Sequence, residues 1–379
     1  MRFVLALSLA AVACYNPALA VQTNAPKPKV LTGAKTTTIA KGLSRPWAMQ
    51  FLPDGRVIIT ERPGAIRIID KQGRVSKPLD GAPKVSARGQ GGMLDIALAP
   101  DFATSKVLYV SYSEPRGPGQ NGTSVARLRL VSDANGDRLQ DGRVIFRQLP
   151  PNGGGLHFGS RVAFARDGTL FVTLGERYRK FLAQDPKVHF GKIVRINPDG
   201  SAPKDNPFVG QAGAQPHIWS IGHRNPQSAA IHPVTGQLWT VEHGAKGGDE
   251  INIPRAGRNY GWPVITYGRD YSGAKIGIGT HNKGMEQPLY YWDPSIAPSG
   301  MAFYSADRFA QWKGNLFVGA LKDRHLSRLV LDGDKVIAEE RLLEGLRSRV
   351  RDVRQGPDGY LYVLTDSTGG RLVRVEPAR

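Results

Sequence analysis

Cysteine is almost absent from this sequence of 379 residues, in which Cys14 is the single example. Cys14 lies in an N-terminal stretch with the form of a secretory signal. Arg2 provides a positive start, residues 3–13 an apolar run, and Ala18 and Ala20 the small residues of a cleavage site. If cleavage follows Ala20, the mature chain has no thiol. Disulfides, cysteine-ligated metals and cysteine nucleophiles are then excluded.

Long apolar runs are also missing. The run at residues 3–13 is too short to span a bilayer, and no later segment reads as transmembrane. We therefore expect a signal peptide at 1–20, a tether rich in Pro, Thr and Lys at 21–38, and a periplasmic or secreted protein. The residues before Cys14 faintly resemble a lipoprotein cleavage box, so a lipid anchor at Cys14 is a less favoured alternative.

Several catalytic signatures are missing too. The sequence has no Walker loop, no Gly-x-Gly-x-x-Gly after a strand, no Gly-x-Ser-x-Gly and no His-Glu-x-x-His. Its eight histidines are spread singly, which argues against a transition-metal site built from histidine. The sequence therefore offers neither a nucleotide cradle nor a hydrolase triad.

Acidic residues are few relative to basic ones: the sequence has 32 Asp and Glu and 51 Lys and Arg, which gives a formal net charge of +19. The basic residues are scattered, with no run of five or six. A dispersed, solvated basic surface is the favoured interpretation, and it would steer anionic ligands or acidic electron acceptors. Export from the cytoplasm argues against a nucleic-acid partner.

Helical periodicity of useful length is absent, whereas turns are abundant: the sequence has 45 Gly and 27 Pro. A turn followed by a short apolar run recurs six times, and a second short alternating run follows most of these units. A unit repeating every 40–50 residues or so is typical of propeller blades. We therefore predict an all-β fold, a six-bladed β-propeller of four-stranded antiparallel blades over residues 39–379. A pair of β-sandwiches is the alternative, but it does not predict six similar turns.

Single polar residues on glycine-rich loops are the candidates for chemistry. His157 lies between Gly155 and Gly159, just before a predicted strand, where a substrate has room beside it. Its ordinary pKa suits proton abstraction near neutral pH. Taken alone, a structural or merely exposed histidine is the commoner case, and His189 has the same His-Phe-Gly context.

Basic residues occur where predicted blades begin: Arg224 (followed by Asn225), Lys322, Arg349 and Arg351. The guanidinium group binds carboxylates and developing oxyanions. If these side chains converge, they would hold one polyanion, although spacing alone does not show convergence. Surface ion pairs are the alternative.

Oxygen ligands for a hard cation such as calcium are available near Gly244, Asp249 and Glu250. A turn with solvated acids is the alternative here. The acidic stretch at 133–141 also has a faint likeness to a calcium loop, but its glycine is misplaced for that motif and a hairpin turn is favoured.

Five motif groups together carry a family resemblance. They are GQGGMLD at 89–95, LHFG at 156–159, the stretch from GHRNPQ at 222–227 through EHG, DEIN and NYGWP to 263, GALK at 319–322 and RVRDV at 349–353. From about Gly42 onward the sequence resembles the soluble pyrroloquinoline-quinone (PQQ) sugar dehydrogenases, the glucose/sorbosone dehydrogenase family. It looks most like the bacterial aldose sugar dehydrogenase branch. The resemblance implies a six-bladed propeller with PQQ, which carries three carboxylates, over the central channel.

The same resemblance implies roles for individual residues. His157 would be the general base that takes the proton from the anomeric hydroxyl of an aldose, while hydride passes from C1 of the sugar to C5 of PQQ and a lactone forms. Arg224 would lie near the quinone oxygens, and an external acceptor would receive the electrons. The implied cofactor contacts are Gln90, Arg224, Asn225, Thr266, Tyr271, Ala320, Leu321, Lys322, Arg349, Val350 and Arg351.

Calcium is implied at two places. PQQ and the carbonyls of Gly244 and Ala245 would hold one ion, and Glu250 with the carbonyl of Tyr260 would hold a structural one. The family often has Pro at the position of Ala245, and the loop after Glu176 is less familiar, so the preferred sugar stays open. A monomer or homodimer is expected. A calcium-dependent propeller lactonase and a non-catalytic propeller binding module are the alternative functions.

Overall fold

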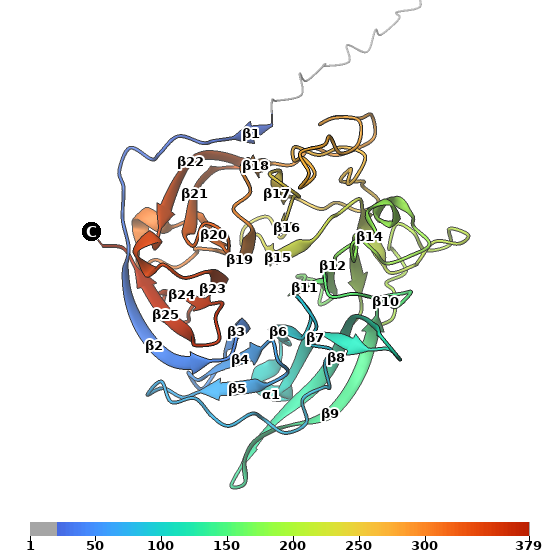
Figure 1. Cartoon of the computed structure of the whole chain (residues 1–379). Coiled ribbons are helices and arrows are strands. Elements are labelled where there is room, and N and C mark those ends of the chain that lie inside the picture. The colour runs from blue at the N-terminus through green and yellow to red at the C-terminus, as the bar shows by residue number, and fades with distance from the viewer. Residues whose placement is uncertain (1–20, 379) are drawn as a thin grey trace, which may run out of the picture.

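Residues 21–378, the part of the chain that this computed structural model describes, form a ring of six small β-sheets (Figure 1). The expected signal peptide at 1–20, with Cys14, lies outside the described residues. Helix is confined to four short pieces in residues 21–378: α1 (Phe102–Ser105), η1 (Lys180–Gln184), η2 (Ala310–Trp312) and η3 (Glu344–Leu346). No helix of this part is long and apolar enough to cross a membrane. The predicted six-bladed all-β propeller is confirmed.

The strands fall into concentric positions. The inner strands are β3 (Pro46–Phe51), β6 (Met93–Leu98), β11 (Gly159–Phe164), β15 (Pro226–Ile231), β19 (Pro298–Phe303) and β23 (Val350–Gln355). The second strands are β4 (Val57–Glu61), β7 (Val107–Pro115), β12 (Leu170–Leu174), β16 (Leu238–Glu242), β20 (Leu316–Ala320) and β24 (Leu361–Thr365). The third strands are β5 (Ile66–Ile69), β8 (Gln120–Asp133), β13 (Lys192–Ile196), β17 (Asp249–Asn252), β21 (Leu326–Asp332) and β25 (Gly370–Glu376).

The outer strands complete five of the six blades. They are β9 (Gly136–Arg147), β14 (Ile218–Ile221), β18 (Tyr290–Trp292), β22 (Lys335–Leu342) and β2 (Lys35–Leu43), while β10 (Asn152–Gly153) and β1 (Gln22–Thr23) add short pairs to β8 and β18. We number the blades 1 to 6 from β3 to β23. Blade 1 has three strands, so the expectation of four in every blade is corrected there. The six predicted turn-and-strand units are the second strands of the six blades.

An N-terminal strand and the last strand of the described chain meet in blade 6. Strand β2 pairs antiparallel with β25, from Lys35 with Glu376 to Leu43 with Gly370, and so closes the ring. The segment expected as a tether at 21–38 belongs to the propeller: β1 pairs parallel with β18, and the carboxylate of Glu340 on β22 accepts hydrogen bonds from the backbone of Thr32. Long-range strand pairing leaves no local sequence signal, which is why composition alone suggested a tether.

Hydrophobic cores lie between neighbouring blades rather than at the centre of the ring. Consecutive residues of one strand serve opposite interfaces: Leu170 and Val172 of β12 pack against blade 2, whereas Phe171 packs against blade 4. Strand β20 does the same, with Leu316 facing blade 4 and Phe317 facing blade 6. Because both faces of each sheet are covered, these strands read as continuous apolar runs.

Every inner strand carries an irregularity near its start. The register against the second strand shifts at positions 46–48, 93–96, 159–162, 226–228, 298–301 and 350–352. In blades 1 to 3 a hydroxyl on the second strand accepts the amide hydrogen bond that the bulge frees, and donates to a carbonyl of the next blade. These hydroxyls belong to Thr60, Ser111 and Thr173. Bulges here therefore join the blades as well as bending the strands.

A buried ionic network connects the inner strands. The guanidinium of Arg161 on β11 has no exposed surface and contacts Asp95 Oδ1 at 3.0 Å and Asp352 Oδ1 at 2.9 Å. Its Nε donates to the carbonyl oxygen of Gln227 at 2.8 Å, and Asp352 Oδ2 accepts from the backbone N–H of Met49 at 3.0 Å. The network therefore touches blades 1, 2, 3, 4 and 6.

Removing one partner of this network leaves an uncompensated charge. We expect Asp95→Ala to lower the free energy of unfolding by about 3–5 kcal/mol, because the guanidinium of Arg161 would stay buried with one carboxylate fewer. Urea unfolding followed by tryptophan fluorescence measures the change. Asp307→Ala, which removes an exposed carboxylate paired with Lys313, is the control and should leave the free energy of unfolding nearly unchanged. Equal losses in the two variants would contradict the assignment.

Candidate active site

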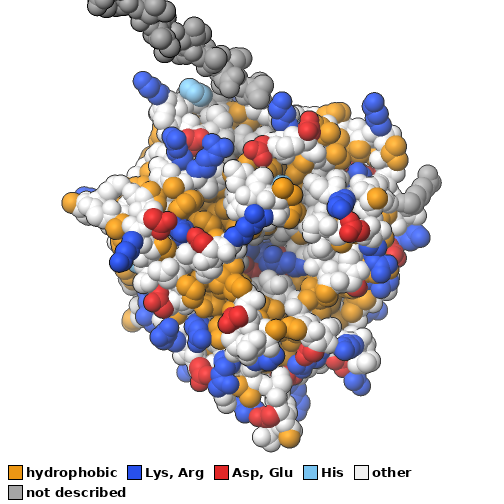
Figure 2. Space-filling model, turned by 180° about the vertical axis from the view of Figure 1, so that it is seen from behind, with side chains coloured by type: hydrophobic (Ala, Val, Ile, Leu, Met, Phe, Trp, Pro, Cys, Tyr) orange, Lys and Arg blue, Asp and Glu red, His pale blue; other side chains and the backbone are white. Residues whose placement is uncertain are grey.

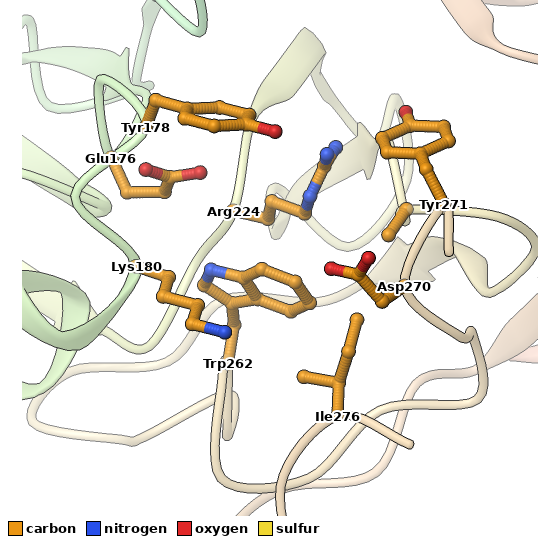
Figure 3. A pocket seen from close by; sticks show the side chains of 9 residues that line it. Glu176, Tyr178, Lys180, Arg224, Trp262, Asp270, Tyr271 and Ile276 are labelled. Carbon is orange, nitrogen blue, oxygen red and sulfur yellow. The ribbon is translucent and has the colours of Figure 1, made fainter. Parts of the chain in front are cut away.

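Three adjoining cavities make up the candidate site. The tyrosine cavity lies among Tyr178, Arg224, Trp262 and Tyr271 (Figure 3). The glutamate cavity shares Arg224 and Trp262 with it, and the arginine cavity shares His243 with the glutamate cavity. The glutamate cavity is lined by Gly222, Arg224, Glu242, His243, Gly244, Gly248, Glu250, Tyr260, Trp262, Ile265 and Thr266. The arginine cavity is lined by Trp47, Arg62, Gln90, Leu94, Phe158, Gly159, Gln227, His243, Ala297, Leu321, Arg349, Arg351 and Asp366.

His157 is held between two of these cavities. Its backbone N–H donates to Gln90 Oε1 at 2.8 Å, on the wall of the arginine cavity. Its Nδ1 lies 2.6 Å from Oε1 of Glu176, on the wall of the tyrosine cavity. The backbone of His157 is left-handed, with φ of 50°, and its carbonyl lies 2.1 Å from where a Cβ on Gly175 would stand. Glycine at 175 is therefore required for the approach.

The partners of His157 fix which of its nitrogens is free. Burial lowers the pKa of His157, outweighing the hydrogen bond with Glu176, which raises it; Arg224 lowers it further. The imidazole is therefore neutral near neutral pH. With a carboxylate at Nδ1, the ring proton belongs on Nδ1, and Nε2 keeps its lone pair. This is the arrangement of a general base with an orienting acid.

Arg224 and Asn225 carry unsatisfied donors. The backbone N–H of Arg224 donates to Glu242 Oε2 at 2.7 Å, and its Nη1 donates to the carbonyl oxygen of His243 at 3.2 Å. Asn225 Oδ1 accepts from the backbone N–H of Gly159 at 3.1 Å. Nε of Arg224 and Nδ2 of Asn225 are buried without a partner. Buried donors left unpaired are costly, so these atoms fit an acceptor on a ligand.

The arginine cavity has a surplus of positive charge. Arg62, Arg349 and Arg351 line it with one carboxylate, Asp366, which lies 3.2 Å from Arg349 Nε and 3.5 Å from Arg351 Nη2. Burial lowers the pKa of Arg351 to about 10, with Asp366 opposing and the neighbouring arginines adding to the fall. Figure 2 shows basic side chains inside a hollow at the centre of the ring. The donor set fits a ligand with several carboxylates.

The remaining residues implied as cofactor contacts are spread around the same cavities. Leu321 lines the arginine cavity, and its carbonyl oxygen accepts from Arg349 Nη1 at 3.3 Å. Thr266 lines the glutamate cavity and the exposed Tyr271 the tyrosine cavity. Lys322 is exposed, with its Nζ donating to the carbonyl oxygen of Ser295 at 2.9 Å. Two others are buried at strand ends beside this region, Ala320 on β20 and Val350 on β23.

The residues implied as calcium ligands also lie together. Gly244, Glu250 and Tyr260 line the glutamate cavity, and Ala245 lines the adjoining tyrosine cavity. Burial and the nearby Glu242 raise the pKa of Glu250 to about 8. Such crowding of carboxylates fits a cation. Within residues 21–378 no group of three or more Asp, Glu, His or Cys side chains could hold a metal, so an ion here would need backbone carbonyls.

Asp249 has a structural role, since its carboxylate is fully engaged. Oδ1 accepts from the backbone N–H of Gly244 at 2.8 Å, and Oδ2 accepts from Ser295 Oγ and from the backbone N–H groups of Ile296 and Ala297. The bonds fix the loop that carries Gly244 against the start of blade 5. The acidic stretch at 133–141 forms the β8–β9 hairpin, as favoured from its sequence.

Sequence reasoning missed several residues of the site. Glu176, Arg62 and Asp366 come from different blades or loops, and none was recognised from its local sequence. Trp262 lies in the NYGWP motif at 259–263, but no role was expected for it. The one available signal was the position of Glu176 directly after a strand and a glycine, like the other candidates. His189 proves different from His157: it is buried, its Nδ1 accepts from the backbone N–H of Leu149 at 3.0 Å, and burial lowers its pKa to about 3.

Comparison with known proteins identifies the family of this chain. The sequence profile of the Glucose / Sorbosone dehydrogenase family matches residues 43–374. The chain belongs to the glucose/sorbosone dehydrogenase family. Among its curated relatives, Escherichia coli (strain K12) aldose sugar dehydrogenase YliI is 49% identical over 338 residues, which cover 88% of this chain and 91% of that protein.

Solved structures of the glucose/sorbosone dehydrogenase family superpose closely. The apo form of the soluble aldose sugar dehydrogenase from Escherichia coli has a TM-score of 0.88 at 47% identity, covering 91% of this chain and 99% of that one. The PQQ-bound form of aldose sugar dehydrogenase from Streptomyces coelicolor has a TM-score of 0.74 at 30% identity, covering 91% and 99%. Both likenesses extend over nearly the whole described ring.

The raised pKa of Glu250 predicts a pH-dependent stability. A carboxyl whose folded pKa lies above its ordinary value stabilises the fold at low pH, and that contribution is lost as the pH rises from about 4.5 through about 8. In calcium-free protein, Glu250→Gln should therefore be the more stable form at pH 8, by on the order of 2 kcal/mol, with no such advantage at pH 4.5. Thermal melts at the two pH values measure this.

Calcium should reverse the ranking at pH 8. The unmutated protein should gain melting temperature with excess calcium, whereas Glu250→Gln should gain little. Glu286→Gln is the matched control, because Glu286 is only half-buried and pairs loosely with Arg258 at 3.7 Å. A full calcium shift in Glu250→Gln would show that Glu250 is not a ligand of the ion.

Proposed function

We propose that the chain is a quinoprotein that oxidises aldose sugars at C1 to lactones, with PQQ and calcium as cofactors and an external electron acceptor. The observation that carries the proposal is the His157–Glu176 pair standing beside the unpaired donors of Arg224 and Asn225 and the surplus of arginines. The named activities of the related aldose sugar dehydrogenases support it.

The residues that would hold PQQ line the three cavities or lie beside them. Arg349, Arg351 and Lys322 would pair with its carboxylates, and Gln90, Asn225, Thr266 and Tyr271 would border it, with the backbone of Ala320, Leu321 and Val350 alongside. Gly244 and Ala245 would hold one calcium by their carbonyls, and Glu250 with Tyr260 a second. When bound, PQQ supplies the two-electron acceptor for hydride, and calcium polarises its carbonyl.

Side chains of the protein carry out the proton transfer and stabilise the developing charge. Nε2 of His157 takes the proton of the anomeric hydroxyl, and Glu176 holds the Nδ1–H and stabilises the imidazolium that forms. The guanidinium of Arg224 faces the tyrosine cavity, with its carbon 5.2 Å from the ring centroid of Trp262. It would donate hydrogen bonds to the negative charge that develops on a quinone oxygen. Tyr178 packs against His157 with ring centroids 5.4 Å apart and restricts water around it.

The arginine surplus favours this proposal over the alternatives. A propeller lactonase needs a metal ringed by carboxylates, for which three arginines on one wall have no use. A binding module needs no histidine tuned to stay neutral beside a carboxylate. Export to the periplasm or beyond, and a monomer or homodimer, belong to the same proposal.

Reconstitution tests the cofactor. Protein freed of cofactors should gain sugar-dependent dye reduction on addition of PQQ and calcium, and a chelator should slow the gain. Arg351→Gln should raise the dissociation constant for PQQ about 10- to 100-fold, since it removes a charge-assisted hydrogen bond. Arg341→Gln, on the outer strand β22, is the control. Equal activity without PQQ would sink the quinoprotein proposal.

Substitution of His157 tests the base. His157→Ala should slow reduction of bound PQQ by an aldose about 100- to 10,000-fold in stopped-flow measurements, with PQQ affinity nearly unchanged. Arg224→Ala should lose both rate and affinity, because its side chain faces cofactor and substrate alike. His281→Ala, at an exposed histidine, is the control. The unmutated rate in His157→Ala would exclude His157 as the base.

A further inference from the structure

The loop after β12 holds an arginine in an unusual setting. Arg177 is 3% exposed, and its backbone is left-handed, with φ of 56°. Its guanidinium carbon lies 3.7 Å from the ring centroid of Phe158. Arg177 lies in the sequence between Glu176 and Tyr178, and both of these neighbours line the tyrosine cavity.

Arg177 contacts the segment that carries His157 both before and after that residue. Its Nε donates to the carbonyl oxygen of Leu156 at 2.9 Å, and its Nη2 donates to the carbonyl oxygen of Gly154 at 3.3 Å. Nη2 also donates to Asn121 Oδ1 at 2.6 Å. The carbonyls precede His157 and the stacked ring of Phe158 follows it, so one guanidinium fixes both flanks of a residue whose own backbone is left-handed.

The charge of Arg177 is poorly compensated. None of its hydrogen bonds within residues 21–378 goes to a carboxylate, and its Nη1 is buried without a partner. Burial lowers the pKa of Arg177 to about 10, and Glu176 is the opposing charge. A buried cation of this kind destabilises a fold compared with an apolar or neutral side chain. Loop geometry alone would not call for a positive charge here.

We propose that Arg177 is the positioning residue for the general base: its guanidinium fixes the backbone of His157, and its charge opposes protonation of the imidazole. The inference rests on the proposed function of His157. The charged groups around the imidazole are Glu176, which favours its protonation, and Arg177 and Arg224, which oppose it; the nearby His243 is titratable but neutral, because burial lowers its pKa to about 3. Without Arg177 the balance moves toward the imidazolium, the segment before His157 loses two hydrogen bonds, and the bond to Asn121 on β8 is lost as well.

A titration of the cofactor-free protein tests the charge directly. The pKa of His157 would be followed by NMR of histidine-labelled protein, with its ring signal assigned from the spectrum of His157→Ala. Arg177→Gln should raise this pKa by about half a unit to one unit, whereas Arg177→Lys, which keeps the charge, should move it less. Arg179→Gln, in the same loop but exposed, should leave it unchanged. An unmoved pKa in Arg177→Gln overturns the electrostatic part of the proposal.

Kinetics of the PQQ-loaded enzyme test the positioning. Arg177→Gln should lower kcat about 10- to 100-fold with KM changed less than about threefold, because a misplaced base slows the proton transfer more than it weakens sugar binding. The acid limb of the pH profile should move upward with the pKa of His157. Arg177→Gly suits the left-handed backbone, and added guanidinium at low concentration should restore part of its rate.

The outcomes are separable. A merely structural arginine would lower the melting temperature without moving the pH profile or responding to guanidinium, and that result would overturn the proposal. If the unmutated protein reduces no dye, the proposed function fails. The titration of Arg177→Gln still decides whether this arginine sets the protonation of His157. A kcat in Arg177→Gln equal to that of Arg179→Gln would exclude the positioning role.

Discussion

The ring depends on the burial of one cation, Arg161, among the inner strands. A fully buried guanidinium is tolerated only when its donors are paired, and here Asp95, Asp352 and the carbonyl of Gln227 come from three other blades. The stacked ring of Trp47, 4.2 Å from the guanidinium carbon, adds a fourth. If blade 2, 3 or 6 slips along its neighbour, a buried ion pair breaks, and if blade 1 or 4 slips, a buried hydrogen bond breaks. Apolar contacts between blades bury most of the surface, but they are not directional and do not fix how one blade is aligned with the next. The ionic network fixes that alignment.

Several residues of the candidate site lie at or just before the starts of the same inner strands. Each of them begins with a register shift, and a bulge there bends the strand next to the residues that precede it. Asn225 directly precedes β15, Val350 opens β23, and His157 lies two residues before β11. Residues from distant parts of the sequence are therefore delivered to one place by a repeated backbone feature. The rigid network behind them holds loops whose own conformations are strained, including the left-handed His157.

Local sequence predicted the strands with two buried faces but not how they join. The units from Leu170 to Val172 and from Leu316 to Val318 were recognisable because turn residues precede short apolar runs. The closing partner of β25 could not be found that way, since β2 lies more than 300 residues away and is rich in Thr and Lys, as an exposed outer strand is. The same limit applies to the site. His157 and Arg224 were found on glycine-flanked loops and by resemblance, whereas Glu176 acts on His157 only through the fold.

The buried arginine side chains of this propeller fall into two groups. Arg161 is matched by carboxylates, and it stabilises the ring. Arg177, Arg224 and Arg351 are buried beside too few carboxylates or with unpaired atoms, and burial lowers the pKa of Arg177 and Arg351 to about 10. A sequence selected for stability alone would replace such residues by neutral ones. Their concentration around three adjoining cavities implies that the missing negative charge arrives with what binds there. An anion of several carboxylates would pair with Arg351, accept from Arg224, and leave Arg177 to keep the neighbouring imidazole neutral. On this view the instability of the empty site and its affinity for the anion have the same physical origin.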